Sequence, residues 1–373
     1  MSNSIKHTDV LIVGGGPSGA SAALSLLNYS KCDVTLIEQS DFNKTRIGEH
    51  VSASIFNLID YLKLSKSDFE EDSFVPAYAS KSYWGSDKVS TTNSIFTTDE
   101  ATFQLDREKF DFKLIETAAE RGATIYPRTK CLDYEQLEDK SWIVFLSHPT
   151  EGKFTIKTNY LVDASGRSAN VCRKVGGSSK KHDSLIGVGL FLELNSTSNK
   201  FEQTLESVEL GWWYTACLPN NKMVITFFSD ADIISEHKLN KLEVWKSLLQ
   251  KTNHIKCLLN NTETLTDKLW VKNAHTQISD VKNLENFIAI GDAAVSFDPI
   301  SSMGIGFSIS SACFAAKYIA HNIEKGFSKT DVYQEDILKN YKQYHDIKTR
   351  YYQEEKRWPT SIFWQRRNQP NNL

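Results

Sequence analysis

The chain has 373 residues, of which 40% are hydrophobic and 24% are charged, and its formal net charge is −3. This composition predicts a soluble globular protein with room for two domains. The small net charge gives no reason to expect binding to nucleic acid or to an anionic membrane. The six cysteines are scattered without metal-like spacing, which fits a reducing compartment and predicts no metal site. No signal peptide or membrane span is evident, so we expect a cytoplasmic protein.

A strand, a glycine turn and a helix open the chain. Residues 9–13 are apolar and β-branched, and the turn Gly14-Gly15-Gly16-Pro17-Ser18-Gly19 leads into an apolar helix over 20–27. In this G-x-G-x-x-G pattern, Gly14 permits the tight turn and Gly16 lets the backbone approach a pyrophosphate closely. Gly19 lets the helix pack against the strand, and the N–H groups at the helix start, where Pro17 and Ser18 lie, face the phosphates. An ordinary glycine loop would show the same pattern.

A carboxylate follows at the distance that a dinucleotide-binding unit requires. A second strand over 33–37 ends at Glu38, nineteen residues after Gly19. A carboxylate placed there can hold the hydroxyls of an adenosine ribose. Strand, glycine turn, helix, strand and acid are thus in register, which predicts dinucleotide binding.

A second strand, turn and helix lie near the end of the chain. A buried strand from Asn286 stops at Gly291 and Asp292, and a turn through Met303 and Gly304 feeds a long helix through Ala320. The Asp292 carboxylate can hold a polyol hydroxyl. The helix start at Gly304 and Ile305 carries partial positive charge, which would stabilise negative charge at the N1–O2 edge of a reduced isoalloxazine. Two such segments suit a cofactor with two ends, which favours FAD over NAD alone.

Several polar residues between these segments are candidates for contact with the cofactor or for catalysis. Arg46 and Glu49 frame an R-x-G-E turn before a helix over 54–62, and His50 follows directly. His50 fits either a loop histidine with a satisfied hydrogen bond or a proton-handling residue that faces the flavin. Arg107, before a helix over 110–121, fits a phosphate contact or a surface ion pair. Asp163 ends an apolar strand and lies near the nucleotide.

The remaining segments predict a second sheet. Residues 76–101 and 183–279 are rich in strand formers, and the runs 186–194, 206–218 and 222–229 predict a mixed antiparallel sheet, with one helix over 242–259. The strand that begins Gly211-Trp212-Trp213-Tyr214 is unusually aromatic, so its side chains fit either a core or a substrate wall. A helix over 340–355 and a last segment with Trp358 and Trp364 close the chain. These two rings are expected to pack the segment onto the body; a partner-binding tail is the alternative.

Taken together, these motifs resemble the single-component FAD monooxygenases and flavin-dependent halogenases over about the first 325 residues. The resemblance implies an α/β fold: a glutathione-reductase-type FAD-binding Rossmann domain with an inserted mixed β-sheet substrate domain and C-terminal helices. It implies oxygen activation as a flavin C4a-hydroperoxide. The cofactor would contact residues of both segments and of the chain between them: Gly14, Gly16, Pro17, Ser18, Gly19, Glu38, Arg46, Glu49, Arg107, Asp163, Gly291, Asp292, Gly304 and Ile305.

Within this superfamily the chain departs from the tryptophan halogenases. Their G-W-x-W-x-I-P strand corresponds here to Gly211-Trp212-Trp213-Tyr214-Thr215-Ala216-Cys217, and Lys81 lies in roughly the region of their catalytic lysine without its surrounding pattern. The runs 211–219, 298–305 and 357–367 are more similar to the maturation flavoproteins of cysteine tryptophylquinone-dependent lysine and glycine oxidases. These flavoproteins oxygenate a tryptophan side chain in a precursor protein.

We therefore expect residues 1–75, 102–182 and 280–328 to form the FAD-binding domain, 76–101 and 183–279 the substrate domain, and 329–373 a helical segment and tail. The predicted enzyme is an FAD-dependent monooxygenase that hydroxylates a peptidyl tryptophan, using O2 and electrons from NAD(P)H or from a flavin reductase. A small-molecule indole or phenol hydroxylase or halogenase is one alternative, and an FAD-containing scaffold for a partner oxidase is another. The candidate catalytic residues are His50 and Asp298, and the candidate substrate pocket comprises Trp84, Trp212, Tyr214 and Ser301.

Overall fold

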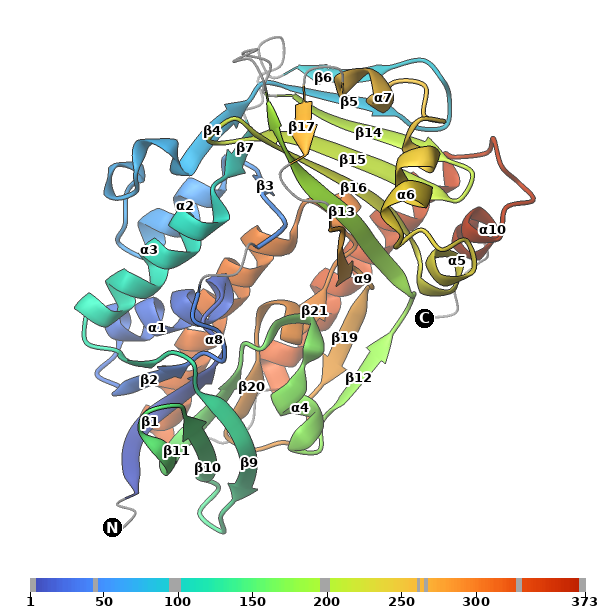
Figure 1. Cartoon of the computed structure of the whole chain (residues 1–373). Helices are drawn as coiled ribbons and strands as arrows, with labels where there is room; N and C mark the ends of the chain where they lie inside the picture. Colours follow the sequence, from blue (N-terminus) through green and yellow to red (C-terminus); the bar gives the residue numbers. More distant parts are fainter. Residues whose placement is uncertain are drawn as a thin grey trace.

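The computed structural model describes residues 5–42, 46–93, 102–194, 202–259, 262–264, 268–326 and 331–368. Within these residues the strands form two large and two small sheets, with helices packed between and around them (Figure 1). The chain is therefore of the α/β class, as its sequence predicts.

The first large sheet, called the β1 sheet, carries the glycine turn. Its central strands are parallel, because β1 pairs with both β2 and β11 and β2 pairs with β8. The long strand β11 has different neighbours along its length. Its first half forms an antiparallel hairpin with β10, and its last residues pair in parallel with β20. In spatial order the described strands are β8 Thr124–Tyr126, β2 Val34–Ile37, β1 Lys6–Val13, β11 Gly152–Asp163, β10 Trp142–His148 and β9 Lys130–Gln136, with β20 Phe287–Ala289 beside β11.

The second large sheet, called the β15 sheet, is mixed and mostly antiparallel, since only β14 and β5 pair in parallel. Its described strands are β17 Thr262–Thr264, β13 Leu185–Leu194, β16 Lys222–Asp230, β15 Gly211–Leu218, β14 Glu202–Val208, β5 Ala79–Tyr83 and β6 Ser90–Asn93, with β18 Trp270–Asn273 beside β13. One face packs against short helices through Trp213 and Trp245. The other face, called the inner face, carries Trp212 and Tyr214.

Two small antiparallel sheets lie between the β1 sheet and the β15 sheet. The first, called the β7 sheet, contains β3 His50–Val51, β7 Thr102–Leu105 and β4 Phe74–Ala77, and β7 contacts β15. The second contains β12 Ser178–Lys181, β19 Gln277–Asp280 and β21 Val295–Ser296. Residues 76–101 were expected to contribute to the substrate sheet. In the structure β5 and β6 do so, whereas β4 pairs with β7 in the small sheet.

Helices cover both large sheets and bridge them. The main apolar core lies around the β1 sheet, where α1 packs against α3 and α8, and α8 and α9 extend from there towards the β15 sheet (Figure 1). The described helices are α1 Pro17–Tyr29, α2 Ile55–Tyr61, α3 Arg107–Glu120, α4 Asn170–Lys174, α5 Ala231–Glu236, α6 Leu242–Leu249, α7 Ile255–Leu258, α8 Gly304–Lys325, α9 Asp331–Gln353 and α10 Ile362–Asn368.

The single helix expected over 242–259 is wrong, because the chain breaks between α6 and α7. The buried carboxylate of Glu206 accepts hydrogen bonds from the backbone N–H groups of Asn253, His254 and Ile255 at 2.6, 3.1 and 2.9 Å. These contacts begin a new helix rather than continue the old one. The expected docking of the last segment is confirmed, since Trp364 is fully buried and Trp358 stacks on it.

Candidate active site

The glycine turn after β1 has the geometry that its sequence predicts. Gly14 has a φ of +118°, and a side chain there would collide with the backbone of Ala164. A side chain at Gly19 would collide with the carbonyl of Gly14, so only glycine allows α1 to pack this closely on the turn. Gly16 is open by comparison: the nearest atom to the place of its missing Cβ is Nη1 of Arg46, at 3.7 Å. The turn therefore leaves room for a ligand at Gly16.

The two predicted cofactor segments meet in space. Gly291 follows β20 with a φ of +56°, and the place of its missing Cβ is 2.8 Å from Cβ of Ser18 in the first turn of α1. Both segments thus end at the same edge of the β1 sheet. This is the edge at which parallel α/β sheets bind ligands.

Glu38 and Asp163 hold the backbone around this edge. The Glu38 carboxylate accepts from the backbone N–H of Gly15 at 2.6 Å and of Ser40 at 2.7 Å. Asp163 is fully buried, and its two oxygens accept from the N–H groups of Ser165 and Cys172, both at 2.8 Å. Asp163 therefore shapes the turn after β11, and direct contact with a nucleotide stays a prediction for both acids.

An acid that the sequence reasoning missed organises the two predicted arginines. Asp111, 3% exposed in its side chain, accepts from Arg46 at 2.8 Å and from Nε and Nη2 of Arg107 at 3.0 and 2.9 Å. Nη1 of Arg107 donates to the carbonyls of Ile47 and Gly48 at 2.8 and 2.7 Å, which fixes the R-x-G-E turn. Asp111 lies four residues after Arg107 on a helix, and that spacing could have revealed the pair.

Asp292 has one paired and one unpaired oxygen. Its Oδ2 lies 3.3 Å from Nε of Arg167, whose Nη atoms donate to the carbonyls of His275 and Phe297, both at 2.8 Å. Its Oδ1 is buried and finds no hydrogen-bond partner among the described residues. Arg167 was not among the predicted site residues, although it directly follows the Asp-Ala-Ser-Gly run. Asp292 is thus held in place with one acceptor unused.

The start of α8 is open. A Cβ at Gly304 or at Gly306 would meet no atom within 4 Å among the described residues. The first N–H groups of a helix have no partner within the helix, so the backbone at Gly304 and Ile305 can donate to a ligand. This arrangement fits the predicted helix end beside a flavin ring.

Three predicted residues lie instead in a packed core beneath the C-terminal helices. Asp298 accepts from the hydroxyl of Tyr352 at 2.8 Å and from the N–H of Ile300 at 3.1 Å, and burial raises its pKa. Trp212, 1% exposed, donates to the same Tyr352 hydroxyl at 3.0 Å. Trp84 donates to a backbone carbonyl of α9 and packs on Trp212. These engagements favour a structural role over catalysis or substrate contact.

The fourth predicted pocket residue, Ser301, lies on the short turn after Asp298. Its hydroxyl donates to the Asp298 carbonyl at 2.9 Å. The side chain is therefore used within the turn that precedes α8, and contact with a substrate stays a prediction.

The other predicted residues gather at the junction of the β7 sheet and the β15 sheet. This junction group consists of Glu49, His50, Gln104 and Tyr214, and sequence reasoning missed only Gln104. Glu49 and Gln104 are 5% and 1% exposed. Oε1 of Glu49, both ring nitrogens of His50 and the amide oxygen of Gln104 are buried without a hydrogen-bond partner among the described residues. The amide nitrogen of Gln104 lies beside the Tyr214 hydroxyl, and its interaction lowers the pKa of that phenol against the larger effect of burial.

Burial determines the charge of this group. It raises the pKa of Glu49 to about 7, against the opposing effect of the Arg107 charge. It lowers the pKa of His50 to about 4, so the imidazole is neutral at pH 7. Burial, and then the charge of Glu49, raises the pKa of Tyr214. At pH 7 the junction group therefore offers a neutral imidazole, amide and phenol, and a carboxyl group that is only partly ionised, to a molecule that enters it.

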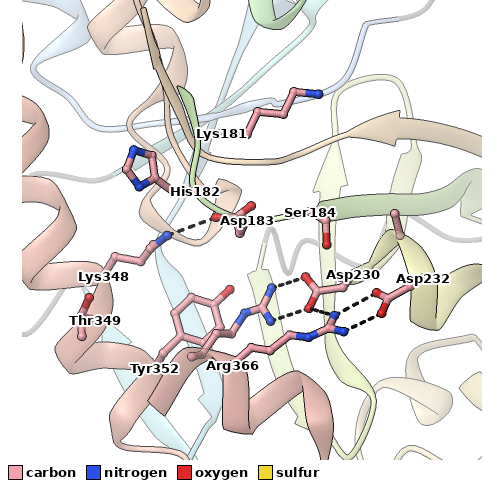
Figure 2. Close-up of a pocket in the computed structure, with 12 residues that line it drawn as sticks. Lys181, His182, Asp183, Ser184, Asp230, Asp232, Lys348, Thr349, Tyr352 and Arg366 are labelled. Carbon is pink, nitrogen blue, oxygen red and sulfur yellow. Dashed lines mark hydrogen bonds and ion pairs between the residues drawn. The ribbon is translucent and has the colours of Figure 1, made fainter. Parts of the chain in front are cut away.

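A separate cavity of about 560 Å³ lies between β12, α5, α9 and α10 (Figure 2). Most of its charged groups form ion pairs with one another. Lys348 lies 3.2 Å from Asp183, and Arg367 lies 2.8 Å from Asp230. Arg366 binds Asp230 as well as Asp232. The cavity thus marks where ion pairs anchor the last helix.

In the part of the chain that the structure describes, no group of three or more histidine, cysteine, aspartate or glutamate side chains could hold a metal ion. Among the described helices, none is long and apolar enough to cross a membrane.

The chain belongs to the family of FAD-binding domain proteins, whose model matches residues 7–346. It is 44% identical over 360 residues to LodB of Marinomonas mediterranea, assigned as an FAD-dependent oxidoreductase, with 96% of each chain covered. It is 25% identical over 342 residues to tryptophan 2-halogenase of Chondromyces crocatus, covering 88% of this chain and 64% of the halogenase.

Solved structures share the fold. The flavin-dependent halogenase CmlS superimposes with a TM-score of 0.85 at 23% identity, covering 99% of this chain and 69% of CmlS. The peptidyl tryptophan dihydroxylase QhpG, essential for tryptophylquinone cofactor biogenesis, gives a TM-score of 0.76 at 18% identity, covering 98% and 81%. The predicted fold and the resemblance to flavin-dependent halogenases are thereby confirmed, and a flavoprotein of quinone-cofactor biogenesis shares the fold.

The residues present fit FAD on three observations. The turn at Gly14 and Gly19 has no room for side chains and is open at Gly16, as a pyrophosphate site requires. Asp292 carries a buried oxygen without a partner in the described chain. The N-terminus of α8 is open at Gly304. These features lie at the ends of the two segments that meet beside Ser18.

Proposed function

We propose that the protein is an FAD-dependent monooxygenase that oxygenates the indole ring of a tryptophan residue in a precursor oxidase, as a step in forming a tryptophylquinone cofactor. Its substrate is then another protein, and its electrons come from NAD(P)H or a flavin reductase. The FAD-binding residues are those predicted from the two glycine segments, with Arg46 and Arg107 beside them.

The junction group is the structural observation that carries this proposal. It consists of buried polar side chains between the flavin cradle and the inner face of the β15 sheet, of which only Glu49 is partly ionised at pH 7. One oxygen of Glu49, both nitrogens of His50 and the amide oxygen of Gln104 are unpaired within the described chain. A site of this kind suits an uncharged aromatic substrate that brings its own hydrogen-bonding group. Similarity to LodB over nearly the whole chain and the shared fold of QhpG support the choice of substrate class.

Reduced FAD, when bound, activates O2 so that one oxygen atom can pass to an electron-rich ring and the other can leave as water. The chain's own residues have three tasks. The glycine turns, Asp292 and the start of α8 hold the cofactor. The apolar sheet surfaces exclude water from the reacting ring. His50, neutral at pH 7, can accept at a ring nitrogen the proton that the oxygenated carbon loses.

The placement of Lys81 does not support halogenation. Its amine pairs with the carboxylate of Glu202 on β14. Two residues further along β5, Tyr83 stacks on His254 beside the short helices, on the face opposite to Tyr214. Side chains two apart on a strand share a face, so Lys81 points away from the junction group.

The proposal can be tested by mass spectrometry with ¹⁸O₂. The FAD-loaded protein, a reductant and a precursor oxidase expressed without its maturation flavoprotein are incubated together, and tryptophan-containing peptides of the precursor are analysed. We expect labelled oxygen on one precursor tryptophan. Labelling of free tryptophan or indole, with the precursor untouched, would contradict the assignment of a protein substrate.

Two controls make the result specific. A precursor in which the labelled tryptophan is replaced by phenylalanine should gain no label. The same protein stripped of FAD should label nothing. If the stripped protein supports precursor maturation equally well, the scaffold alternative is correct and the monooxygenase proposal fails.

A further inference from the structure

The β7 sheet has one apolar and one polar face. Alternation along β7 sends Phe103 and Leu105 into the main core beside Phe74. His50 and Gln104 are directly paired across β3 and β7, so their side chains project from the opposite face. The sequence Thr-Phe-Gln-Leu thus builds a sheet whose polar side faces away from the apolar core.

This polar face is buried rather than solvated. Gln104 is 1% exposed, and its amide oxygen has no hydrogen-bond partner among the described residues, whereas its amide nitrogen interacts with the Tyr214 hydroxyl. The ring nitrogens of His50 are also unpaired among the described residues. A buried amide oxygen without a partner is costly, and such groups are rare in folded proteins. A partner from outside the described residues is therefore expected at Gln104.

The inner face of the β15 sheet supplies an apolar surface next to this amide. Around Tyr214 lie Ala216, Val224 and the partly buried rings of Phe191 and Trp270, a cluster distinct from the larger cores. A Cβ at Gly189 would lie 2.6 Å from the Trp270 ring, so this glycine lets the indole lie flat on the sheet. An apolar, aromatic surface bordered by an unpaired amide oxygen suits an aromatic ring with one polar edge.

We propose that Gln104 is the residue that selects the substrate by accepting a hydrogen bond from the N–H of its aromatic ring, with His50 opposite completing this polar edge. The inference deepens the proposed function and rests on it, because it assigns the recognised group within the same site. Gln104 is a positioning residue: it holds the ring at the junction and takes no part in bond making.

The experiment compares two ligands that differ in the ring N–H alone. N-acetyl-tryptophan amide and its 3-benzothienylalanine analogue, in which sulfur replaces the N–H without added bulk, are titrated into the FAD-loaded protein. Binding is followed by the flavin difference spectrum. The wild type should bind the tryptophan derivative about ten-fold or more tightly, because the thiophene leaves the buried amide oxygen unpaired. Gln104→Leu should bind both ligands equally.

Two further readouts separate recognition from structure. FAD affinity should change less than about two-fold in Gln104→Leu, since the amide faces the substrate; a loss of ten-fold or more would overturn the proposal by placing Gln104 on the cofactor. The melting temperature should stay equal or rise, because an apolar side chain of similar size removes an unpaired buried amide oxygen. Gln277→Leu is the matched contrast, since that buried amide pairs with His275 and Arg167, and its loss should lower the melting temperature.

The binding of the two probes decides whether Gln104 recognises the ring N–H. A wild type that binds both probes equally, or that binds neither, overturns the assignment of Gln104 even if ¹⁸O labelling of a precursor succeeds. A ten-fold preference that Gln104→Leu abolishes supports it even if no oxygen is transferred. Should the leucine variant fail to fold, Gln104→Met removes the same amide with an unbranched side chain and must give the same loss of preference.

Discussion

Two buried polar groups of this molecule differ in whether their side chains find partners. In the first, beneath the C-terminal helices, Glu355 is 1% exposed and accepts from Gly85 at 2.8 Å, from Ser207 at 2.6 Å and from Arg357 at 2.6 Å. In the junction group, Glu49 is nearly as buried, yet one of its oxygens has no partner among the described residues.

The same residue type thus serves two purposes. A buried carboxylate with every acceptor used holds segments together, since it joins the end of β5, strand β14 and the last segment of the chain. A buried carboxylate with an unpaired oxygen can accept a hydrogen bond from a cofactor or a substrate that binds beside it. The opposite pKa directions reflect this difference. Burial alone would raise the pKa of Glu355, but hydrogen bonds from Arg357 and Ser207 lower it, whereas the pKa of Glu49 is raised to about 7.

The largest effect is expected from breaking the paired group. Glu355→Ala should reduce the free energy of unfolding by about 3–5 kcal/mol, because it removes the buried partner of the Arg357 charge and leaves the Gly85 N–H without its acceptor. Chemical denaturation followed by tryptophan fluorescence measures the change. The segment that carries Trp358 should also become accessible to proteolysis before the rest of the chain.

The neighbouring Glu354 provides the matched control. It is exposed, so Glu354→Ala should change the free energy of unfolding by no more than about 0.5 kcal/mol. Equal effects of the two substitutions would show that the pairing of Glu355 is not what stabilises the C-terminal segment.

A smaller effect, with a characteristic pH dependence, is expected from Glu49→Gln. Between its ordinary pKa of 4.5 and the folded value of about 7, the folded protein keeps a proton that the unfolded chain has released. The stability of the wild type therefore falls as pH rises through this range, and that of the glutamine variant lacks this contribution. The difference in unfolding free energy should grow in favour of Glu49→Gln by up to about 3 kcal/mol from pH 4.5 to pH 7.

Denaturation of the FAD-free proteins at several pH values measures this difference. His50, whose pKa burial lowers to about 4, gives the opposite slope between pH 4 and 6.5. Because His50 is present in both proteins, its contribution cancels. A difference that stays constant with pH would mean that Glu49 is solvated or paired in solution, and the comparison with Glu355 would lose its basis.

Local patterns in the sequence were sufficient to predict the glycine turn and the strand ends around it. The glycines at 14 and 19 have no room for a side chain, so the fold dictates these residues and their spacing reveals the turn. The ends of β1, β2 and β20 follow from apolar runs that stop at a glycine or an acid. The residue types and the covalent order were enough, because each such unit forms from neighbouring residues.

Contacts between distant segments were not predictable in this way. Trp212 was equally compatible with core or substrate wall, and it is the docking of Tyr352, 140 residues later, that places it in the core. Gln104 resembles any polar strand residue until β7 is seen to lie against β15. The break before α7 depends on Glu206, which lies 47 residues before Asn253. Which polar groups find partners is a property of the packed molecule.

The smallest effect is expected where a charged pair is partly exposed and lies on the face opposite to the junction group. The side chains of Lys81 and Glu202 are 35% and 26% exposed, so Lys81→Met should cost less than about 1 kcal/mol of stability. Because Lys81 projects from the face of β5 opposite to Tyr214, the same variant should keep oxygenation of the precursor within about two-fold of wild type. Product formation is measured by mass spectrometry with chloride present.

Glu202→Gln completes this test, because it breaks the same ion pair while leaving the amine in place. Both variants should behave alike if the pair is only structural. A loss of product with Lys81→Met alone, or a chlorinated product formed by the wild type and absent from that variant, would show that the amine reaches the substrate. Lys81 would then act on the reacting ring. In that case a side chain that is paired in the structure could still be functional, and hydrogen bonding alone would not distinguish structural from functional residues in this protein.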